Sequence, residues 1–125
     1  MTANRKTVLI VDDEWAICEL LADHLRDTNL RVISANNADE FREKAFSERP
    51  DLILLDIMLG NSNGVDVYNR LLAGGLDKNI PVIFMSALAD GHPQDHAVQG
   101  RHYALYSKPF DTDNLVREIH SFVGA

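Results

Sequence analysis

Cysteine is almost absent from this chain of 125 residues, which contains a single one, Cys18. One cysteine cannot form an intramolecular disulfide, so the fold must be stabilised by its hydrophobic core. A domain of this length buries roughly two thirds of the surface that its unfolded chain exposes. Cys18 lies within an apolar pattern of helical spacing, and we expect it to be a small core residue in a reducing compartment.

Long hydrophobic runs and basic clusters are missing as well. No apolar run approaches the ~18 residues that cross a membrane, and the first seven residues are polar, unlike a signal peptide. We therefore expect a soluble cytoplasmic protein with no membrane partner. Lys and Arg number 12 against 19 Asp and Glu, a formal net charge of -7. Because no basic cluster is available to displace counterions, direct binding to nucleic acid is not expected.

Short apolar runs alternate with segments of helical periodicity along the chain. The runs predict five buried strands, at residues 7–11, 31–35, 52–56, 81–85 and 103–107. The periodic segments predict helices at residues 15–25, 38–47, 65–72 and 112–123, with a short helix around residues 94–99. This alternation implies βαβ units with right-handed crossovers. We predict one α/β domain over residues 1–125, a (βα)5 flavodoxin-like doubly wound fold whose five-stranded parallel sheet has the order 2-1-3-4-5.

Several details of these elements are also predicted. Asn37 begins the second helix, and Asp12 or Asp13 caps the first. Residues 60–64, Gly-Asn-Ser-Asn-Gly, form a turn-rich loop before the third helix. Four apolar side chains of the last helix are expected to face the core: Leu115, Ile119, Phe122 and Val123.

Polar and charged side chains stand where the predicted strands end. The third strand stops on Asp56, the first is followed by Asp12 and Asp13, the fourth by Ser86 and the fifth by Lys108. In open α/β sheets, ligands bind beyond the carboxyl ends of the strands. Because the first and third strands are neighbours in the predicted order, we expect these side chains to meet in one site.

Three converging carboxylates repel one another, and a hard cation relieves that repulsion. Mg²⁺ suits such a group because it prefers oxygen ligands. A carboxylate beside Mg²⁺, with a lysine and a hydroxyl nearby, is equipped for phosphoryl transfer, where catalysis is mostly positioning and charge neutralisation. In this chemistry Asp56 would be the nucleophile and would form an acyl phosphate.

With these residues in place, essentially the whole chain resembles the receiver domain of bacterial two-component response regulators, the family of the single-domain chemotaxis regulator. The matching residues are Asp12-Asp13, Asp56, Ser86 and Lys108-Pro109-Phe110, each after the corresponding strand. The resemblance implies a signalling switch and phosphoprotein. Such a protein catalyses only its own phosphotransfer and autodephosphorylation, and is not otherwise an enzyme.

The resemblance also implies how the phosphoryl group is received. Asp56 would accept it from a phosphohistidine on a sensor histidine kinase or a histidine phosphotransfer protein. Ser86 would donate a hydrogen bond to the phosphoryl oxygen, and Lys108 would pair with its charge. The peptide between Lys108 and Pro109 is expected to be cis, a geometry that proline permits.

The resemblance implies a metal site at the same acids. Asp13 would bind Mg²⁺ directly and Asp12 would bind it through water. Asp56 and the backbone carbonyl of Met58 would complete the ligands from the protein.

Two positions depart from the family pattern. The usual Met-Pro after the phosphorylated aspartate is Leu59-Gly60 here, which favours a looser loop. The switch aromatic three residues before the lysine is Leu105 here. Tyr106 is adjacent and therefore points to the opposite face of the strand, whereas Tyr103 shares the face of Leu105. The departure concerns how phosphorylation is coupled to an aromatic side chain, and leaves the phosphorylation chemistry intact.

Other interpretations are open. The acids after the first strand are also suitable as plain helix caps. An aspartyl-phosphate phosphatase of the haloacid dehalogenase type uses the same nucleophile with Mg²⁺, but needs a second acid where this chain has Met58. A flavin- or dinucleotide-binding fold is disfavoured because the first loop is acidic and has no glycine-rich fingerprint. His92 and His96 have a metal-binding spacing, but Pro93 lies between them and favours a solvated loop.

The extent of the chain suggests how it acts. It starts at Met1 and ends just after the last predicted helix, so we expect a stand-alone regulator. The alternative is the receiver portion of a hybrid histidine kinase or of a multidomain regulator. In either case we expect output through contact with a downstream protein, by way of the region from Gly91 to Phe122.

Overall fold

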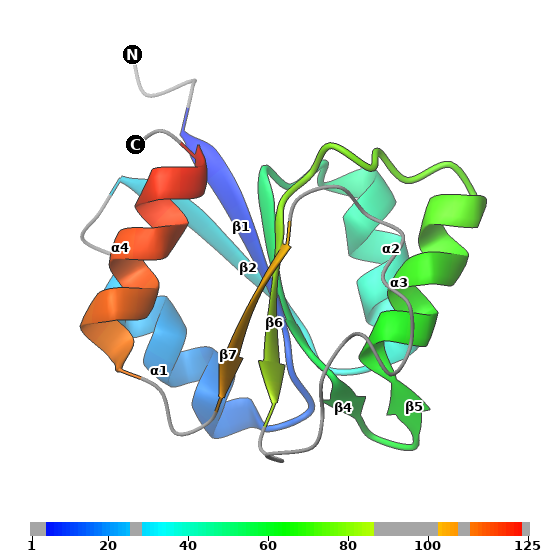
Figure 1. The fold of residues 1–125 in the computed structure, drawn as a ribbon, viewed down its shortest axis with the longest axis horizontal. Coiled ribbons are helices and arrows are strands. Elements are labelled where there is room, and N and C mark those ends of the chain that lie inside the picture. Colours follow the sequence, from blue (N-terminus) through cyan, green and yellow to red (C-terminus); the bar gives the residue numbers. More distant parts are fainter. Residues whose placement is uncertain (1–4, 26–28, 87–102, 108–110, 124–125) are drawn as a thin grey trace.

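Five parallel strands form the central sheet of the computed structural model, which describes residues 5–25, 29–86, 103–107 and 111–123. The strands are β1 (Lys6–Val11), β2 (Leu30–Ala35), β3 (Leu52–Asp56), β6 (Val82–Ser86) and β7 (Tyr103–Ser107). Their order is β2-β1-β3-β6-β7, and every adjacent pair is parallel (Figure 1). The predicted fold class and strand order are therefore confirmed.

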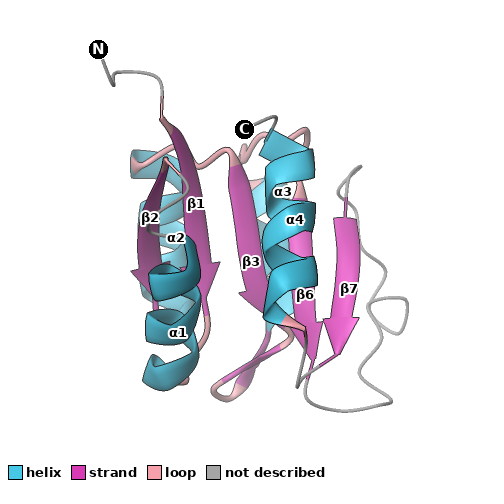
Figure 2. Cartoon of the chain, turned by 90° about the vertical axis from the view of Figure 1, so that its left-hand side faces the viewer, coloured by secondary structure: helices cyan, strands magenta, loops and turns pink. Residues whose placement is uncertain are grey.

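Helices cover both faces of this sheet. Helices α1 (Trp15–Leu25) and α4 (Thr112–Val123) lie on one face, and α2 (Ala38–Ser47) and α3 (Gly64–Ala73) lie on the other (Figure 2). The predicted short helix around residues 94–99 lies outside the described residues. Among the helices described, none combines the length and the apolar character needed to span a bilayer.

One hydrophobic core lies on each side of the sheet, and β3 contributes to both cores. Leu52 and Leu54 point to the core beneath α1 and α4, whereas Ile53 and Leu55 point to the core beneath α2 and α3. Successive side chains of a strand face opposite sides, so a strand covered on both sides must be apolar throughout. This explains the unbroken apolar run that ends on Asp56.

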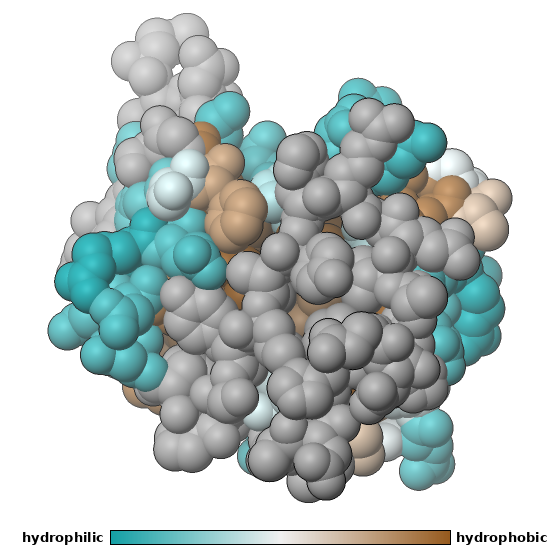
Figure 3. Space-filling model, viewed as in Figure 1, coloured by the Kyte–Doolittle hydropathy of each residue, from teal (hydrophilic) through white to brown (hydrophobic). Residues whose placement is uncertain are grey.

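Helix α4 corrects one prediction about its inner face. Leu115, Ile119 and Val123 are buried at spacings of four residues, as expected. Phe122 was predicted to face the core but is 36% exposed, because it lies at the edge of the stripe that those three residues form. Hydrophilic side chains cover the outer side of α4, at the left of Figure 3.

Exposed apolar side chains occur on the other helices too. Phe46 shares a helix face with buried Phe41 and Ala45 in the sequence pattern, yet it is 41% exposed at the end of α2. Trp15 and Leu20 of α1 are 67% and 43% exposed, although they belong to the apolar pattern of that helix. Cys18 is buried, so the core position predicted for it is confirmed.

Candidate phosphoacceptor and metal site

Three carboxylates meet at the carboxyl ends of β1 and β3. These strands are hydrogen-bonded neighbours, which places Asp12, just after β1, beside Asp56, the last residue of β3. Asp13 joins them, and one carboxylate oxygen from each of the three acids lies within 4.8 Å of the others. Asp12 and Asp56 are buried while Asp13 is exposed, so the cluster opens to solvent on the Asp13 side.

A backbone N–H group donates to each of these carboxylates. Glu14 donates to Oδ1 of Asp12 at 2.9 Å, and Met58 donates to Oδ1 of Asp56 at 3.0 Å. Gly60 donates to Oδ2 of Asp13 at 3.1 Å. Hydrogen bonds of this kind fix the orientation of a carboxylate. Each acid of the cluster is thus oriented by a backbone donor.

The backbone of Asp12 is fixed by the end of β2, by the residue that follows it and by α1. Its N–H donates to the carbonyl of Ala35 at 3.1 Å, and its carbonyl accepts from Nδ2 of Asn36 at 3.0 Å. Sγ of Cys18 also donates to this carbonyl at 3.5 Å. Sequence reasoning missed Asn36, since nothing in the local pattern distinguishes it from Asn37, which caps α2 through the N–H of Glu40.

The start of α3 lies against the backbone of Asp56. Gly64, the first residue of α3, donates to the carbonyl of Ile57 at 2.6 Å. A Cβ at position 64 would lie 2.2 Å from the carbonyl oxygen of Asp56, so only glycine fits without a shift. Asn63 caps the helix, and its Oδ1 accepts from the N–H groups of Val65 and Asp66. Sequence reasoning saw a turn-rich loop here and missed this close approach.

Of the other predicted site residues, the structure describes Ser86 and Met58 but not Lys108. Ser86 is the last residue of β6 and is buried; β6 pairs with β3 in a register that sets Met85 opposite Asp56. Ser86 therefore lies one residue beyond Asp56 along the sheet. The side chain of Met58 is exposed, and its backbone N–H donates to the carboxylate of Asp56. Lys108 lies outside the described residues.

The donor set fits a hard cation. Three carboxylates offer oxygen ligands only, and Mg²⁺ takes oxygen ligands while keeping several waters, which an exposed edge such as that at Asp13 admits. A cavity of about 570 Å³ elsewhere in the molecule contains none of these acids. It is lined by Phe46, Arg49 and Pro81 among others, near the amino ends of β3 and β6. The candidate site therefore lies at an open sheet edge, apart from that cavity.

Comparisons with known proteins identify the family of this chain. Residues 8–120 match the family model of the response regulator receiver domain. The chain is 32% identical over 119 residues to the polar-differentiation response regulator DivK of Brucella anthropi, covering 95% of this chain and 97% of DivK. It is 33% identical over 117 residues to the phosphate regulon transcriptional regulatory protein PhoB of Pseudomonas aeruginosa, covering 91% of this chain but 50% of PhoB.

Solved structures show the same fold. The receiver domain of a sensor histidine kinase from Pseudomonas aeruginosa, described with a magnesium ion coordinated in its active site cleft, superposes with a TM-score of 0.82. The two sequences are 22% identical, and the match covers 97% of this chain and 99% of that one. From the family match together with this fold, the chain belongs to the response regulator receiver domain family, the phosphoacceptor switches of two-component signalling.

Proposed function

We propose that Asp56 is the residue of this receiver that accepts the phosphoryl group, and that Asp12 and Asp13 hold Mg²⁺ beside it. The observation that carries the proposal is the convergence of the three carboxylates at the ends of two adjacent strands. Asp56 is buried at the end of a fully buried strand, and burying a carboxylate costs free energy, which favours a functional role for this acid. The residues 1–125 would then act as one receiver domain.

The transfer itself needs one nucleophile and one leaving group. A carboxylate oxygen of Asp56 attacks the phosphorus of a phosphohistidine and forms an O–P bond. The N–P bond breaks, and its electron pair stays on the imidazole nitrogen, which takes up a proton. The hydrogen bond from the N–H of Met58 to Oδ1 fixes the orientation of the carboxylate before the attack.

Four groups of this chain would hold the metal: the carboxylates of Asp12, Asp13 and Asp56, and the backbone carbonyl of Met58. The chemistry that Mg²⁺ supplies when bound is neutralisation of negative charge on the transferring phosphoryl group. The hydrogen bonds to the backbone of Asp12 keep this acid at the end of β1, beside Asp56.

Ser86 and Lys108 would contact the phosphoryl group after transfer. Ser86 is supported by its position one residue beyond Asp56 on the adjacent strand. Its hydroxyl would donate to a phosphoryl oxygen, and the ammonium of Lys108 would pair with the phosphoryl charge.

The donor would be a sensor histidine kinase or a histidine phosphotransfer protein. Two large apolar side chains near the cluster support a protein donor: Trp15 is 67% exposed on the first turn of α1, and Met58 is 49% exposed beyond Asp56. Exposed aromatic and methionine side chains are typical of protein interfaces. A downstream target would contact the region from Gly91 to Phe122, of which α4 is described and exposes Phe122.

Intact mass after incubation with Mg²⁺ and a small acyl phosphate tests the acceptor. We expect the wild-type chain to gain one phosphoryl group that is lost at raised pH, and Asp56→Asn to gain none. Phosphorylation of Asp56→Asn to the wild-type extent would refute the assignment. Because some receivers require a protein donor, beryllium fluoride is the second probe: unchanged amide spectra around Asp56 and Ser86 with this phosphoryl mimic would also count against it.

A further inference from the structure

The three N–H donors of the acidic cluster differ in how far they reach along the chain. Glu14 and Met58 each donate to the carboxylate two residues before them, the local bond of an Asx turn. Gly60 instead donates to Asp13, 47 residues earlier in the chain. This bond therefore connects the loop after β3 to the acid after β1.

Gly60 lies at the tip of a small hairpin that sequence reasoning had taken for a looser loop. Residues Met58–Leu59 (β4) pair antiparallel with Ser62–Asn63 (β5), and Gly60 turns the chain with φ +61 (Figure 1). A Cβ at this position would meet nothing within 4 Å. Glycine is thus favoured here by the backbone conformation and not by lack of space.

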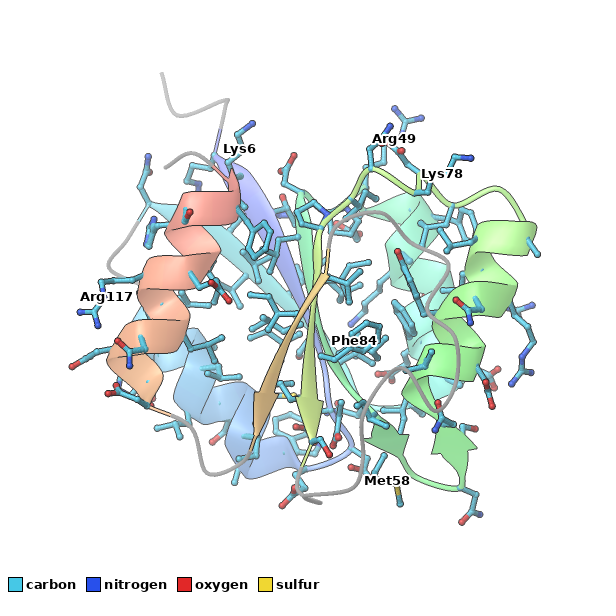
Figure 4. All side chains as sticks on the ribbon, in the orientation of Figure 1. Lys6, Arg49, Met58, Lys78, Phe84 and Arg117 are labelled. Atoms are coloured by element: carbon cyan, nitrogen blue, oxygen red, sulfur yellow. The ribbon has the colours of Figure 1, made fainter. Side chains whose placement is uncertain are left out.

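Proline, the residue of the family pattern at this position, cannot provide this bond. It has no N–H, and its φ is fixed near −65°. The glycine of this chain therefore adds a donor at a place where the pattern has none. Figure 4 shows the side chain of Met58 at the same loop, pointing away from the sheet, while its N–H serves Asp56.

Of the three acids, Asp13 is the one that most needs such a bond. Asp12 and Asp56 are buried, so packing confines their side chains. Asp13 is exposed, and repulsion from the other two carboxylates would turn it outward into water. A donor on Oδ2 of Asp13 offsets that repulsion and keeps the carboxylate beside its neighbours.

We propose that Gly60 is a positioning residue of the metal site: its N–H holds the carboxylate of Asp13 beside Asp12 and Asp56, ready to bind Mg²⁺. This inference depends on the proposed function, because it assigns Asp13 to the metal. Partners that orient a metal ligand in this way typically change metal affinity by about 10- to 100-fold when removed.

Three substitutions at Gly60 separate the N–H from the backbone conformation, with the dissociation constant of Mg²⁺ measured by calorimetry or by the fluorescence of Trp15, the single tryptophan. Gly60→Asn keeps the N–H and tolerates positive φ. Gly60→Ala keeps the N–H but is strained, and Gly60→Pro has no N–H. We expect Asn and Ala to bind Mg²⁺ within about threefold of wild type, and Pro to bind it about tenfold more weakly. Wild-type affinity in Pro, or an equal loss in Ala and Pro, would overturn the inference.

Amide hydrogen exchange of Gly60 gives a second readout that needs neither metal nor the proline variant. In the metal-free wild-type protein we expect the Gly60 amide to be protected, and in Asp13→Ala to exchange at least tenfold faster. Equal exchange in the two proteins would overturn the bond. If wild type bound no Mg²⁺ while this difference persisted, the proposed function would fail and the tether between Gly60 and Asp13 would stand, so the two failures are distinguishable.

Discussion

Gly64 allows the first turn of α3 to lie against the backbone of Asp56. Its missing Cβ would be 2.2 Å from the carbonyl oxygen of Asp56 and 3.3 Å from Cα of Ile57. Both are backbone atoms, which cannot rotate away as a side chain does. Any larger residue at position 64 must therefore displace either α3 or the end of β3.

We predict that Gly64→Ala destabilises the fold by about 1–3 kcal/mol, the usual range for overpacking, and slows phosphorylation of Asp56. Urea unfolding and intact mass with a small acyl phosphate measure the two effects. The matched control is Gly74→Ala at the other end of α3, where a Cβ would lie 3.5 Å from the nearest carbonyl oxygens. Equal behaviour of the two variants would contradict the steric explanation.

Tyr68 is the second residue with a defined energetic consequence. It is buried and packs edge-to-face on Phe84 with ring centroids 6.0 Å apart, but its hydroxyl has no hydrogen-bond partner in the described part of the chain. Burial, and to a lesser degree the carboxylate of Asp77, raise the pKa of Tyr68 above its usual value of 10.0.

We predict that Tyr68→Phe leaves the fold equally stable or raises its stability by about 1 kcal/mol, because an unpaired buried hydroxyl is removed. Below pH 10 the folded and unfolded states both keep the Tyr68 proton. Above it, the unfolded state releases the proton first, so wild-type stability falls as pH rises toward the folded pKa. Denaturant midpoints between pH 8 and 11 should show a smaller fall in Tyr68→Phe; the same fall in both proteins would exclude Tyr68 as its source.

At the scale of elements, α2 and α3 both begin with an asparagine cap but differ in their distance from the site. Asn37 and Asn63 each accept a backbone N–H from the first turn of the following helix. Helix α3 starts next to the backbone of Asp56, whereas α2 follows β2 and has no such contact in the described structure. Substituting each of the two caps therefore distinguishes a loss of helix stability from an effect on the site.

We predict that Asn37→Ala and Asn63→Ala each destabilise the protein by about 1 kcal/mol, the typical loss for an N-cap. Asn63→Ala should also slow phosphorylation of Asp56, because the hairpin and the start of α3 hold the loop that follows this acid. Thermal unfolding and phosphorylation rates measure these effects. A similar slowing in Asn37→Ala would mean that global stability, not the loop, controls the rate.

For the whole molecule, the sheet order brings like charges together at one edge. The chain already carries a net charge of -7, and the cluster adds local repulsion between Asp12, Asp13 and Asp56. The folded state retains this repulsion, while the unfolded chain separates the acids. A cation that binds only the folded cluster must therefore stabilise the protein.

We predict that Mg²⁺ at 100 times its dissociation constant adds about 2.7 kcal/mol to the free energy of unfolding. Thermal unfolding with and without Mg²⁺, at matched ionic strength, measures this gain. Asp13→Asn should lose most of it. No stabilisation of wild type, or an equal gain in Asp13→Asn, would refute the assignment of Mg²⁺ to this cluster.

Much of the fold was predictable because strong local signals coincide with the tertiary environment. Residues 38–47, 52–56 and 112–123 were predicted with the bounds that the structure shows, since Asn37 caps one helix and full burial dictates the run that ends on Asp56. The hairpin at Met58–Asn63 was missed because its strands have two residues each, too few to give a period. The cytoplasmic location and stand-alone form stay predictions.

The sequence by itself determined which residues we propose for the chemistry. Acids, a hydroxyl and a lysine at the ends of apolar runs point to one edge of a parallel sheet, and they do so through local pattern alone. Only the tertiary structure decided how the acids are held. The N–H of Gly60 meets Asp13 across 47 residues, Asn36 reaches the carbonyl of Asp12, and Gly64 touches Asp56. Such contacts depend on strand neighbours in space, which no local pattern specifies.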